Sequence, residues 1–499
     1  MQVSLIAAEI FIGKAITRSH SDESTAVYGA VEGKSYFVKP LKKERFEALA
    51  GYTRRPESQL VGGELEWYAD PTERVIGVFL EDLIDHDFQG IVLGRDARQR
   101  FRAVDFTEFA EAPQLARQRL FEKMEEWTRR PESDFHQGDE KGTALDIFTP
   151  VVSVDRLHPS FLRVATGEGF SPARSLIEAM MPYYEDVDGN FVEQFQTAAF
   201  DARFWELYLF ALLTEQGFAF DRSFHAPDFY CERFLDRVFV EAVTVNPTTN
   251  AAGIVTEAAV PAEKEAFIKY YQEYMPMKWG SPLTSKLKKK YWEMPHVAGK
   301  PIAFAIQDFH IPRAMTFLAN SLPPYLYGVS FTALYDEHEN LNVTTMARGP
   351  HEWGSKTIES GFFSLPDSEH VSAVVTNPTA TISKFNRMAF LAGFGGDDVR
   401  MICRGTCHDH DPNAAVPRQF AFDINDPDYL ESWAEGANVF HNPNASIPLD
   451  ESFLPDAAHH RFEDGVFRSI IPEFHPYNSE TLIVTPERRD EPAKFSQLR

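Results

Sequence analysis

The stretch that decides the expected fold is residues 201–245, DARFWELYLFALLTEQGFAFDRSFHAPDFYCERFLDRVFVEAVTV. Its first part predicts a helix, because Asp201 is a favourable N-cap residue and Gly217 is the residue type preferred just after a helix end. Apolar side chains lie on almost every side of this helix, which predicts that it is buried. Glu206 lies inside that apolar wall, and a buried carboxylate needs a partner.

The same stretch ends in a segment that is typical of a central β-strand. Residues 238–245, VFVEAVTV, are β-branched or apolar on both faces, with Glu241 in the middle. An unpaired carboxylate in such a strand would strongly destabilise the fold. We therefore expect Glu241 to face a cation, a group of hydrogen-bond donors or a solvent-filled site.

A second carboxylate is expected to lie beside Glu241. Asp228 precedes Glu241 by thirteen positions, and the turn-like residues 235–237 lie between them. This spacing predicts two neighbouring antiparallel strands that bring Asp228 and Glu241 together, with Glu206 next to them.

This arrangement resembles the PD-(D/E)XK nuclease superfamily, whose members have a restriction-endonuclease-like fold. Residues 227–228 match the PD element, residues 241–243 match the ExK element, and Glu206 matches the acidic residue often carried on the preceding helix. The resemblance covers residues 201–310, about a fifth of the chain, and the flanking sequence is similar to that of bacterial proteins with this core. One position departs from the motif, because Val243 stands where the family has lysine.

The resemblance implies an α/β core, a mixed sheet flanked by helices, that hydrolyses phosphodiester bonds of DNA or RNA. Glu206, Asp228 and Glu241 would be catalytic, and Asp228 and Glu241 would bind Mg²⁺, with Mn²⁺ as a substitute. Their chemistry suits this role, since hard divalent cations take oxygen ligands and acidify bound water.

The strongest basic segment follows the carboxylates. Residues 280–292, GSPLTSKLKKKYW, predict a helix that begins at Ser281-Pro282 and continues through Trp292. Lys286 and Lys290 would lie one turn apart on one face, so we expect this helix to supply the catalytic lysine that is missing at Val243. The lysines expected to bind nucleic acid are Lys286, Lys288, Lys289 and Lys290.

Further elements complete the expected core. Residues 261–274 predict a helical stretch, and residues 300–306, KPIAFAI, predict a fourth buried strand. The resulting order of helix, three strands, helix and strand is the core order of the nuclease superfamily. Farther along the chain, residues 372–378 and 381–388 predict a pair of strands with a proline turn between them.

Composition divides the chain into four regions. We expect a β-rich N-terminal domain at residues 1–150, a linker at 151–200 and the nuclease-like core at 201–330. Residues 331–499 would complete or extend that core.

A near repeat occurs within the N-terminal region. Residues 52–58, YTRRPES, and residues 127–133, WTRRPES, share six identical residues after an aromatic one. The simpler interpretation is a duplicated helix end that stops before proline. The alternative interpretation is a functional arginine clamp.

Charge and cysteine content limit the possible functions. The net charge of −25 argues against a protein that coats DNA, so nucleic acid should bind locally. Three cysteines in 499 residues do not make a disulfide framework, and no stretch reaches the roughly 18 apolar residues of a membrane span. We therefore expect a cytoplasmic protein with nucleic acid, first of all DNA, as its partner, no membrane association, and a homodimer as an open alternative.

Two other functions stay open. A catalytically inactive relative could bind nucleic acid or a protein partner, with its acids neutralised by the lysines of residues 286–290. Two cysteines and two histidines also have the ligand types of a zinc site, but their spacing is too compressed for the usual two-knuckle arrangement, and a solvated loop is the better interpretation. These residues are Cys403, Cys407, His408 and His410.

Overall fold

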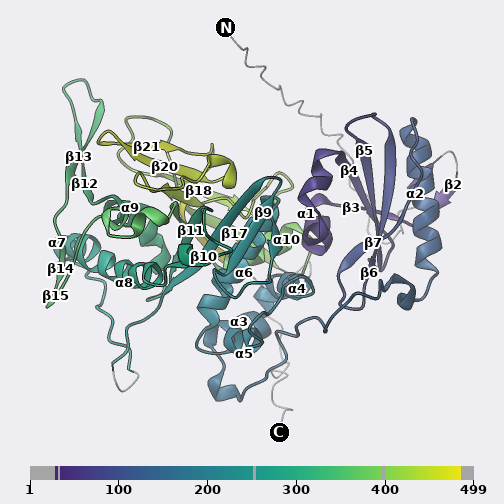
Figure 1. Cartoon of the computed structure of the whole chain (residues 1–499), viewed down its shortest axis with the longest axis horizontal. Coiled ribbons are helices and arrows are strands. Elements are labelled where there is room, and N and C mark those ends of the chain that lie inside the picture. The colour runs from purple at the N-terminus through teal and green to yellow at the C-terminus, as the bar shows by residue number, and fades with distance from the viewer. Residues whose placement is uncertain (1–28, 32–33, 251–253, 396–398, 485–499) are drawn as a thin grey trace.

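The computed structural model describes residues 29–31, 34–250, 254–395 and 399–484 of the chain (Figure 1). Figure 1 shows an elongated molecule, with a small sheet and helix α2 (Pro113–Thr128) at one end and the other elements around a larger sheet. The fold is therefore mixed α/β, as the sequence predicts. The two ends of the chain, residues 1–28 and 485–499, lie outside the described residues.

The N-terminal region forms an antiparallel meander covered by α2. Its strands pair in chain order, and a glycine on β6 allows the helix to approach closely, since a Cβ on Gly90 would lie 2.8 Å from Leu120 Cβ. The elements are β1 (Gly29–Val31) and β2 (Lys34–Tyr36) as a separate pair, then β3 (Lys39–Leu41), α1 (Lys43–Ala50), β4 (Gly62–Ala69), β5 (Val75–Asp82), β6 (Phe88–Arg95) and β7 (Phe101–Phe106).

The segment expected to be a linker holds helices that pack into the central core. They are α3 (Pro159–Thr166), α4 (Ser171–Met180) and α5 (Phe191–Gln196). Phe161, Leu176 and Phe195 are buried in the same apolar cluster as the helix expected at residues 201–217. The proline, glycine and acidic residues that suggest a linker lie at the ends of these helices. Each helix between them is so short that its apolar periodicity is difficult to recognise in the sequence.

Eight of the described strands form the central sheet. The sheet is mixed, because β10 pairs parallel with β11 and antiparallel with β9. Strands from the C-terminal region extend it beyond β11. In spatial order the strands are β21 (Val466–Ile470), β20 (Ala458–Glu463), β19 (Asn438–His441), β16 (Ala373–Thr376), β11 (Ile302–Asp308), β10 (Asp236–Val245), β9 (Phe229–Arg233) and β8 (Ala219–Asp221).

Helices cover both faces of this sheet. The expected buried helix is α6 (Phe200–Glu215), and it packs on the face that carries Val240 and Ala242 of β10. Phe239 and Val243 of β10 point to the opposite face, where α8 packs. Although α6 is apolar on all sides, no helix in the described part of the chain is long and apolar enough to cross a membrane.

The covering helix on the second face begins earlier and ends earlier than predicted. A continuous rod is formed by α7 (Lys264–Lys269), a π-helical turn (Tyr270–Tyr274) and α8 (Met275–Leu287). Pro282 lies inside α8 instead of starting it, and the helix stops before Lys288. Gly280 allows a neighbouring helix to pack closely, because a Cβ there would lie 2.7 Å from the Tyr325 hydroxyl.

The described residues that follow β11 form small sheets and two further α-helices. Residues 381–388, expected as a strand, belong to helix α10 (Ile382–Leu391), whose first turn is capped by the Thr381 hydroxyl. The capping signal decides this element against its β-prone composition. The other elements are α9 (Leu318–Tyr327), β12 (Val329–Tyr335), β13 (Leu341–Ala347), β14 (His351–Trp353), β15 (Lys356–Ile358), β17 (Arg400–Cys407), β18 (Arg418–Asp423) and β22 (Pro476–Val484).

A group of buried histidines connects the edge of the central sheet to β22. His460 and His475 both contact Asn438 Oδ1, at 3.0 and 3.1 Å, and His441 contacts the His459 ring at 2.9 Å. Burial lowers the pKa of His441 and His460 to about 3 and that of His475 to about 4. These histidines are therefore neutral in the folded protein at neutral pH.

We expect His460→Gln to reduce the acid sensitivity of the fold. Because the unfolded chain binds a proton at His460 near pH 6.5 and the folded chain does not, stability is lost as the pH falls below about 6.5. The parent should lose up to about 1.4 kcal/mol per pH unit relative to the variant. Urea unfolding at several pH values measures this difference, with the exposed His338→Gln as control. If the difference in unfolding free energy between the parent and His460→Gln stays constant with pH, the prediction is wrong.

Candidate functional site

The strand register places Asp228 next to Glu241. Strands β9 and β10 pair antiparallel up to Phe229 opposite Val240, so the next residues on each side are Asp228 and Glu241. The Asp228 amide donates to Glu241 Oε2 at 3.2 Å, and the Ala242 amide donates to Asp228 Oδ2 at 2.7 Å. The two carboxylates that the sequence predicts to converge therefore lie side by side.

Glu241 is held by a cation and a phenol that come from the face of the sheet covered by α8. Its side chain is 4 % exposed, and its Oε1 accepts short hydrogen bonds from Lys286 Nζ and from the Tyr291 hydroxyl. Burial and the Glu241 charge raise the pKa of Tyr291, which keeps this residue a donor. The Lys286 side chain is 26 % exposed, so its ammonium group lies between Glu241 and solvent.

The motif position Val243 is part of the apolar core. It lies on the same face of β10 as Glu241 and is fully buried in one cluster with Leu283, Tyr291 and Phe304. A lysine at this position would have to place its ammonium group in that cluster. Lys286 reaches Glu241 from the last turn of α8 instead.

Glu206 has a partner of its own. Arg203, one turn earlier on α6, donates to both oxygens of Glu206 at 2.9 and 2.7 Å, and the Tyr184 hydroxyl donates at 3.2 Å. Burial raises the pKa of Glu206, and Arg203 opposes that shift. The sequence predicts a partner for this carboxylate but does not identify it.

Asp228 is the least neutralised of the three carboxylates. Its pKa lies well above its usual value, because of burial first and then of the charges on Glu241 and Glu206. Lys286 opposes this shift without cancelling it. Asp228 Oδ1 accepts no hydrogen bond from any residue that the structure describes. This oxygen is therefore available to an added cation or donor.

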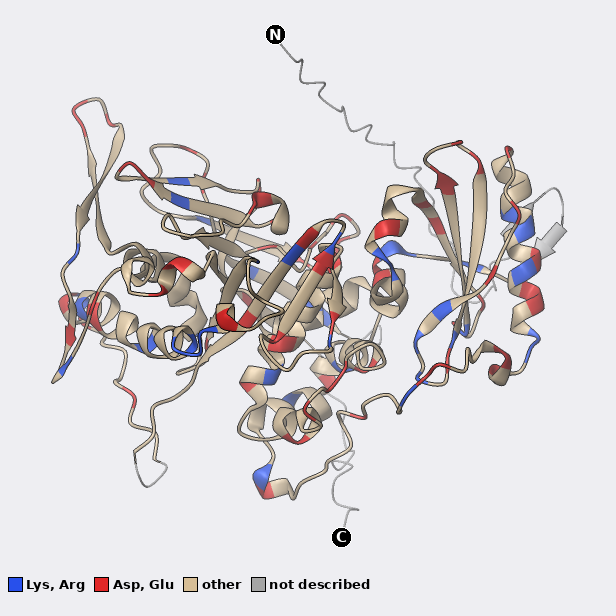
Figure 2. Ribbon diagram, viewed as in Figure 1, with Lys and Arg blue, Asp and Glu red and all other residues tan. Residues whose placement is uncertain are grey.

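The other predicted lysines lie away from the acids. Lys288, Lys289 and Lys290 follow the end of α8 and are exposed, and Figure 2 shows them as part of a blue segment beside that helix. Lys290 has a positive φ of 51° and lies 3.5 Å from Glu293 and 3.6 Å from Asp367. Of the lysines expected to be catalytic, the structure brings Lys286 to the carboxylates and Lys290 to a different pair of acids.

Two ions are relevant to the candidate ligands: the expected magnesium at the acids, and zinc at the cysteines and histidines, which the sequence makes the poorer interpretation. Within the described residues, no group of three or more His, Cys, Asp and Glu side chains is arranged to hold a metal ion. Cys403 and Cys407 are four residues apart on β17, about 13 Å along an extended strand. His408 contacts the Tyr477 hydroxyl, and His410 contacts the Glu473 carbonyl.

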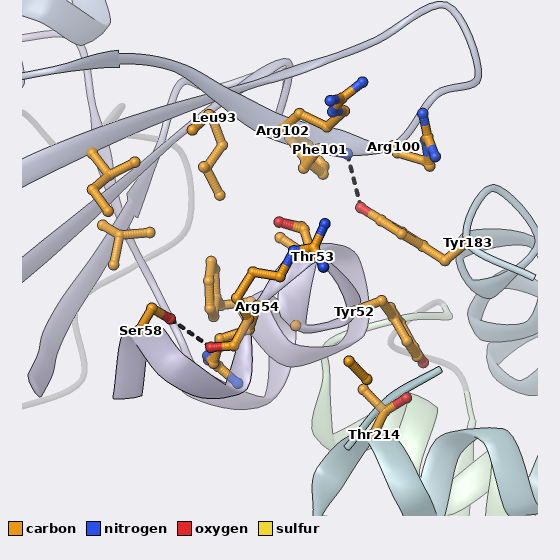
Figure 3. A pocket seen from close by; sticks show the side chains of 18 of the residues that line it. Tyr52, Thr53, Arg54, Ser58, Leu93, Arg100, Phe101, Arg102, Tyr183 and Thr214 are labelled. Carbon is orange, nitrogen blue, oxygen red and sulfur yellow. Dashed lines mark hydrogen bonds between the residues drawn. The ribbon is translucent and has the colours of Figure 1, made fainter. Parts of the chain in front are cut away.

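A cavity that the sequence does not reveal lies between the N-terminal meander and the core. It has a volume of about 820 Å³ and is lined by residues that include segments 50–55, 100–103 and 217–220 (Figure 3). Its wall includes Arg222, whose guanidinium group donates to the Asp228 carbonyl at 2.8 Å. We call it the arginine cavity. Residues of the repeat at 52–58, including its two adjacent arginines, contribute to the lining.

No protein-family model, curated protein or solved structure matches this chain. The chemistry of the side chains that the fold brings together is therefore the guide to its function.

Opposite effects on stability are expected from Asp228→Asn and Glu241→Gln. At a pH above its raised pKa, Asp228 is ionised in the folded protein, and this buried charge costs free energy of folding. Its neutral replacement should therefore raise the melting temperature at pH 8 by about 2 °C or more, and by less at pH 5. Glu241→Gln leaves Lys286 without its carboxylate and should cost about 1–3 kcal/mol.

Thermal and urea unfolding in EDTA measure both effects without any contribution from metal. If Asp228→Asn destabilises the protein as much as Glu241→Gln, the Asp228 carboxylate is required for folding. The proposed free-energy cost of keeping Asp228 ionised would then be wrong.

Proposed function

We propose that this protein is a metal-dependent nuclease of the PD-(D/E)XK type that hydrolyses phosphodiester bonds of DNA or RNA. The observation that carries the proposal is the contact between Lys286 and Glu241 beside Asp228, which supplies a lysine where Val243 departs from the motif. The connectivity supports it as well, since α6, β8, β9, β10, α8 and β11 follow the order of the nuclease core.

The pairing of those strands agrees with this assignment. Strand β10 lies between β9 and β11, antiparallel to the first and parallel to the second, so Glu241 lies on an interior strand of a mixed sheet and Asp228 immediately precedes the neighbouring strand β9. Central strands hold side chains rigidly, and a site on them keeps its geometry better than a site on loops.

The donor set fits a magnesium ion, though not an ion held by protein alone. Mg²⁺ is usually bound by one or two carboxylates together with water and substrate phosphates, and Asp228 and Glu241 are two such carboxylates. The raised pKa of Asp228 favours a cation at this position. When bound there, the ion would acidify water and offset the negative charge that develops on the phosphate.

The side chains around the carboxylates have separable roles in this proposal. Lys286 is partly exposed, so its remaining N–H groups can orient water or a phosphate oxygen while one binds Glu241. Tyr291 fixes the Glu241 carboxylate from the buried side. Glu206 is bound to Arg203 and acts on Asp228 through its charge.

We expect Lys286→Met to lower cleavage by about 100-fold or more, because it removes the cation beside Glu241. Lys290→Met is the matched control, since Lys290 follows the same helix but contacts Asp367 and Glu293. Both variants should be assayed with Mg²⁺ and Mn²⁺ on single- and double-stranded DNA and on RNA. Parental activity in Lys286→Met would exclude the proposed role of this lysine.

A binding-only protein is the second candidate. It is favoured by the ion pair itself, because Lys286 already neutralises Glu241, and by the lack of a three-ligand metal group among the described residues. Calorimetry with Mn²⁺ separates the two candidates. Binding that is lost in Asp228→Asn supports the nuclease, whereas a parent that neither binds Mn²⁺ nor cleaves any nucleic acid supports the second candidate.

A further inference from the structure

The arginine cavity lies where hydrogen bonds and stacked rings join two parts of the chain. The Tyr183 hydroxyl accepts from the Phe101 amide at 2.8 Å and donates to the Leu49 carbonyl at 2.7 Å, so it ties the core to the meander. Tyr52 stacks on both Tyr183 and Phe210, with ring centroids 5.1 and 5.2 Å apart. Figure 3 shows Arg100 and Arg102 on one side of the space and Arg54 on the other.

The lining of this cavity is basic, although the whole chain is acidic. Among the described residues, seven Lys and Arg side chains and three Asp and Glu side chains line it, a local charge of +4 in a chain of −25. Arg54, Arg100 and Arg102 are bound to nearby carboxylates. The other four basic residues, Arg55, Arg98, Lys141 and Arg222, have no ion-pair partner in the part of the chain that is described.

Two of these arginines carry buried nitrogens without partners. Arg98 Nε and Arg222 Nη2 are inaccessible to solvent and make no hydrogen bond to any described residue. Leaving a buried charged donor unpaired is costly, so such groups usually have a partner. The rest of each guanidinium group carries a positive charge that no described carboxylate pairs, so a ligand with several acceptor oxygens would offset both charges.

The size of the cavity limits what can enter it. Its volume of about 820 Å³ equals a cube with an edge of about 9 Å, whereas the major groove of duplex DNA alone is about 12 Å wide. A short piece of one nucleic-acid strand fits this space, and a double helix does not. Phe106, which lines the cavity and is 53 % exposed, offers a ring on which a base can stack.

One wall residue links the cavity to the segment that carries Asp228. Arg222 lines it and donates to the Asp228 carbonyl at 2.8 Å, and its guanidinium group lies over the rings of Tyr184 and Phe229. Tyr184 in turn donates to Glu206. A strand held in the cavity would therefore contact Arg222, which is bound to the Asp228 backbone.

We propose that the arginine cavity binds the sugar–phosphate backbone of single-stranded nucleic acid through Arg55, Arg98 and Arg222. The binding stands on the cavity alone, whereas the delivery of that strand to Asp228 and Glu241 rests on the proposed nuclease function.

The test measures binding of a fluorescent oligo(dT) strand and of a duplex of the same length to the full chain in EDTA, where cleavage cannot occur. The parent should bind the single strand more tightly than the duplex. Arg55→Ala and Arg98→Ala should each weaken single-strand binding about fivefold. Each should also reduce the slope of log K against log salt by about 0.7, the value for one lost phosphate contact on a single strand.

The near repeat provides a matched control. Arg130 occupies the same place in residues 127–133 that Arg55 occupies in residues 52–58, but it lies over the Trp127 ring and pairs with Glu126 outside the cavity. Arg130→Ala removes the same charge and should bind like the parent. Equal losses in Arg55→Ala and Arg130→Ala, no loss in Arg55→Ala and Arg98→Ala, or equal affinity for the duplex would each overturn the proposal.

The same variants separate this proposal from the nuclease. A parent that binds single strands through Arg55 and Arg98 but never cleaves with Mn²⁺ keeps the cavity proposal and removes the nuclease. If the Arg55→Ala/Arg98→Ala double variant cleaves single strands like the parent, the nuclease stands and the cavity is not its substrate site. Circular dichroism melting verifies that each variant is folded.

Discussion

The burial of Glu241 in a strand covered on both faces is the constraint on which the rest of the core depends. A carboxylate at this position is tolerated only with partners, and it has three: Lys286, Tyr291 and the Asp228 amide. Two of these come from the end of α8 and the turn that follows it. The helix must therefore cross the sheet at this point, and Gly280 lets it pack closely against α9 as it does so.

The carboxylates at this site differ in whether a neighbouring cation offsets their negative charge. Glu241 is matched by Lys286, and Glu206 is matched by Arg203. The negative charges of Glu241 and Glu206 disfavour ionisation of Asp228. One Asp228 oxygen also accepts no hydrogen bond from the described residues. A fold that needed these acids only for packing would gain stability by replacing Asp228. Asp228 is therefore better explained by a chemical role than by a contribution to stability.

Net charge says little about where this chain can bind a polyanion. The arginine cavity gathers basic residues from four separate parts of the sequence, around positions 54, 100, 141 and 222. Local positive charge inside a concave, partly desolvated space attracts anions more effectively than the same charges dispersed over a surface. An overall charge of −25 would then oppose indiscriminate coating of nucleic acid without preventing binding at one place.

The sequence alone determined the elements whose signals are local. The apolar pattern on almost every side of α6, the apolar character of both faces of β10 and the spacing of Asp228 and Glu241 each follow from neighbouring residues, and the structure contains these elements in the expected order. The missing lysine at position 243 is also visible in the sequence, because Val243 is a single substitution in a short motif. By contrast, composition concealed the helices of residues 151–200, and the cap at Thr381 outweighed β-propensity in α10.

Only the tertiary structure decided which charges meet. Lys286 and Lys290 are equivalent candidates on a helical wheel, but α8 ends at Leu287 and the chain then turns at Lys290, so one lysine reaches Glu241 and the other reaches Asp367. The arginine cavity is likewise absent from any local pattern, since its walls are far apart in the chain. Electrostatic interactions depend on distance and burial, and residues distant in sequence acquire both only when the sheets and helices pack.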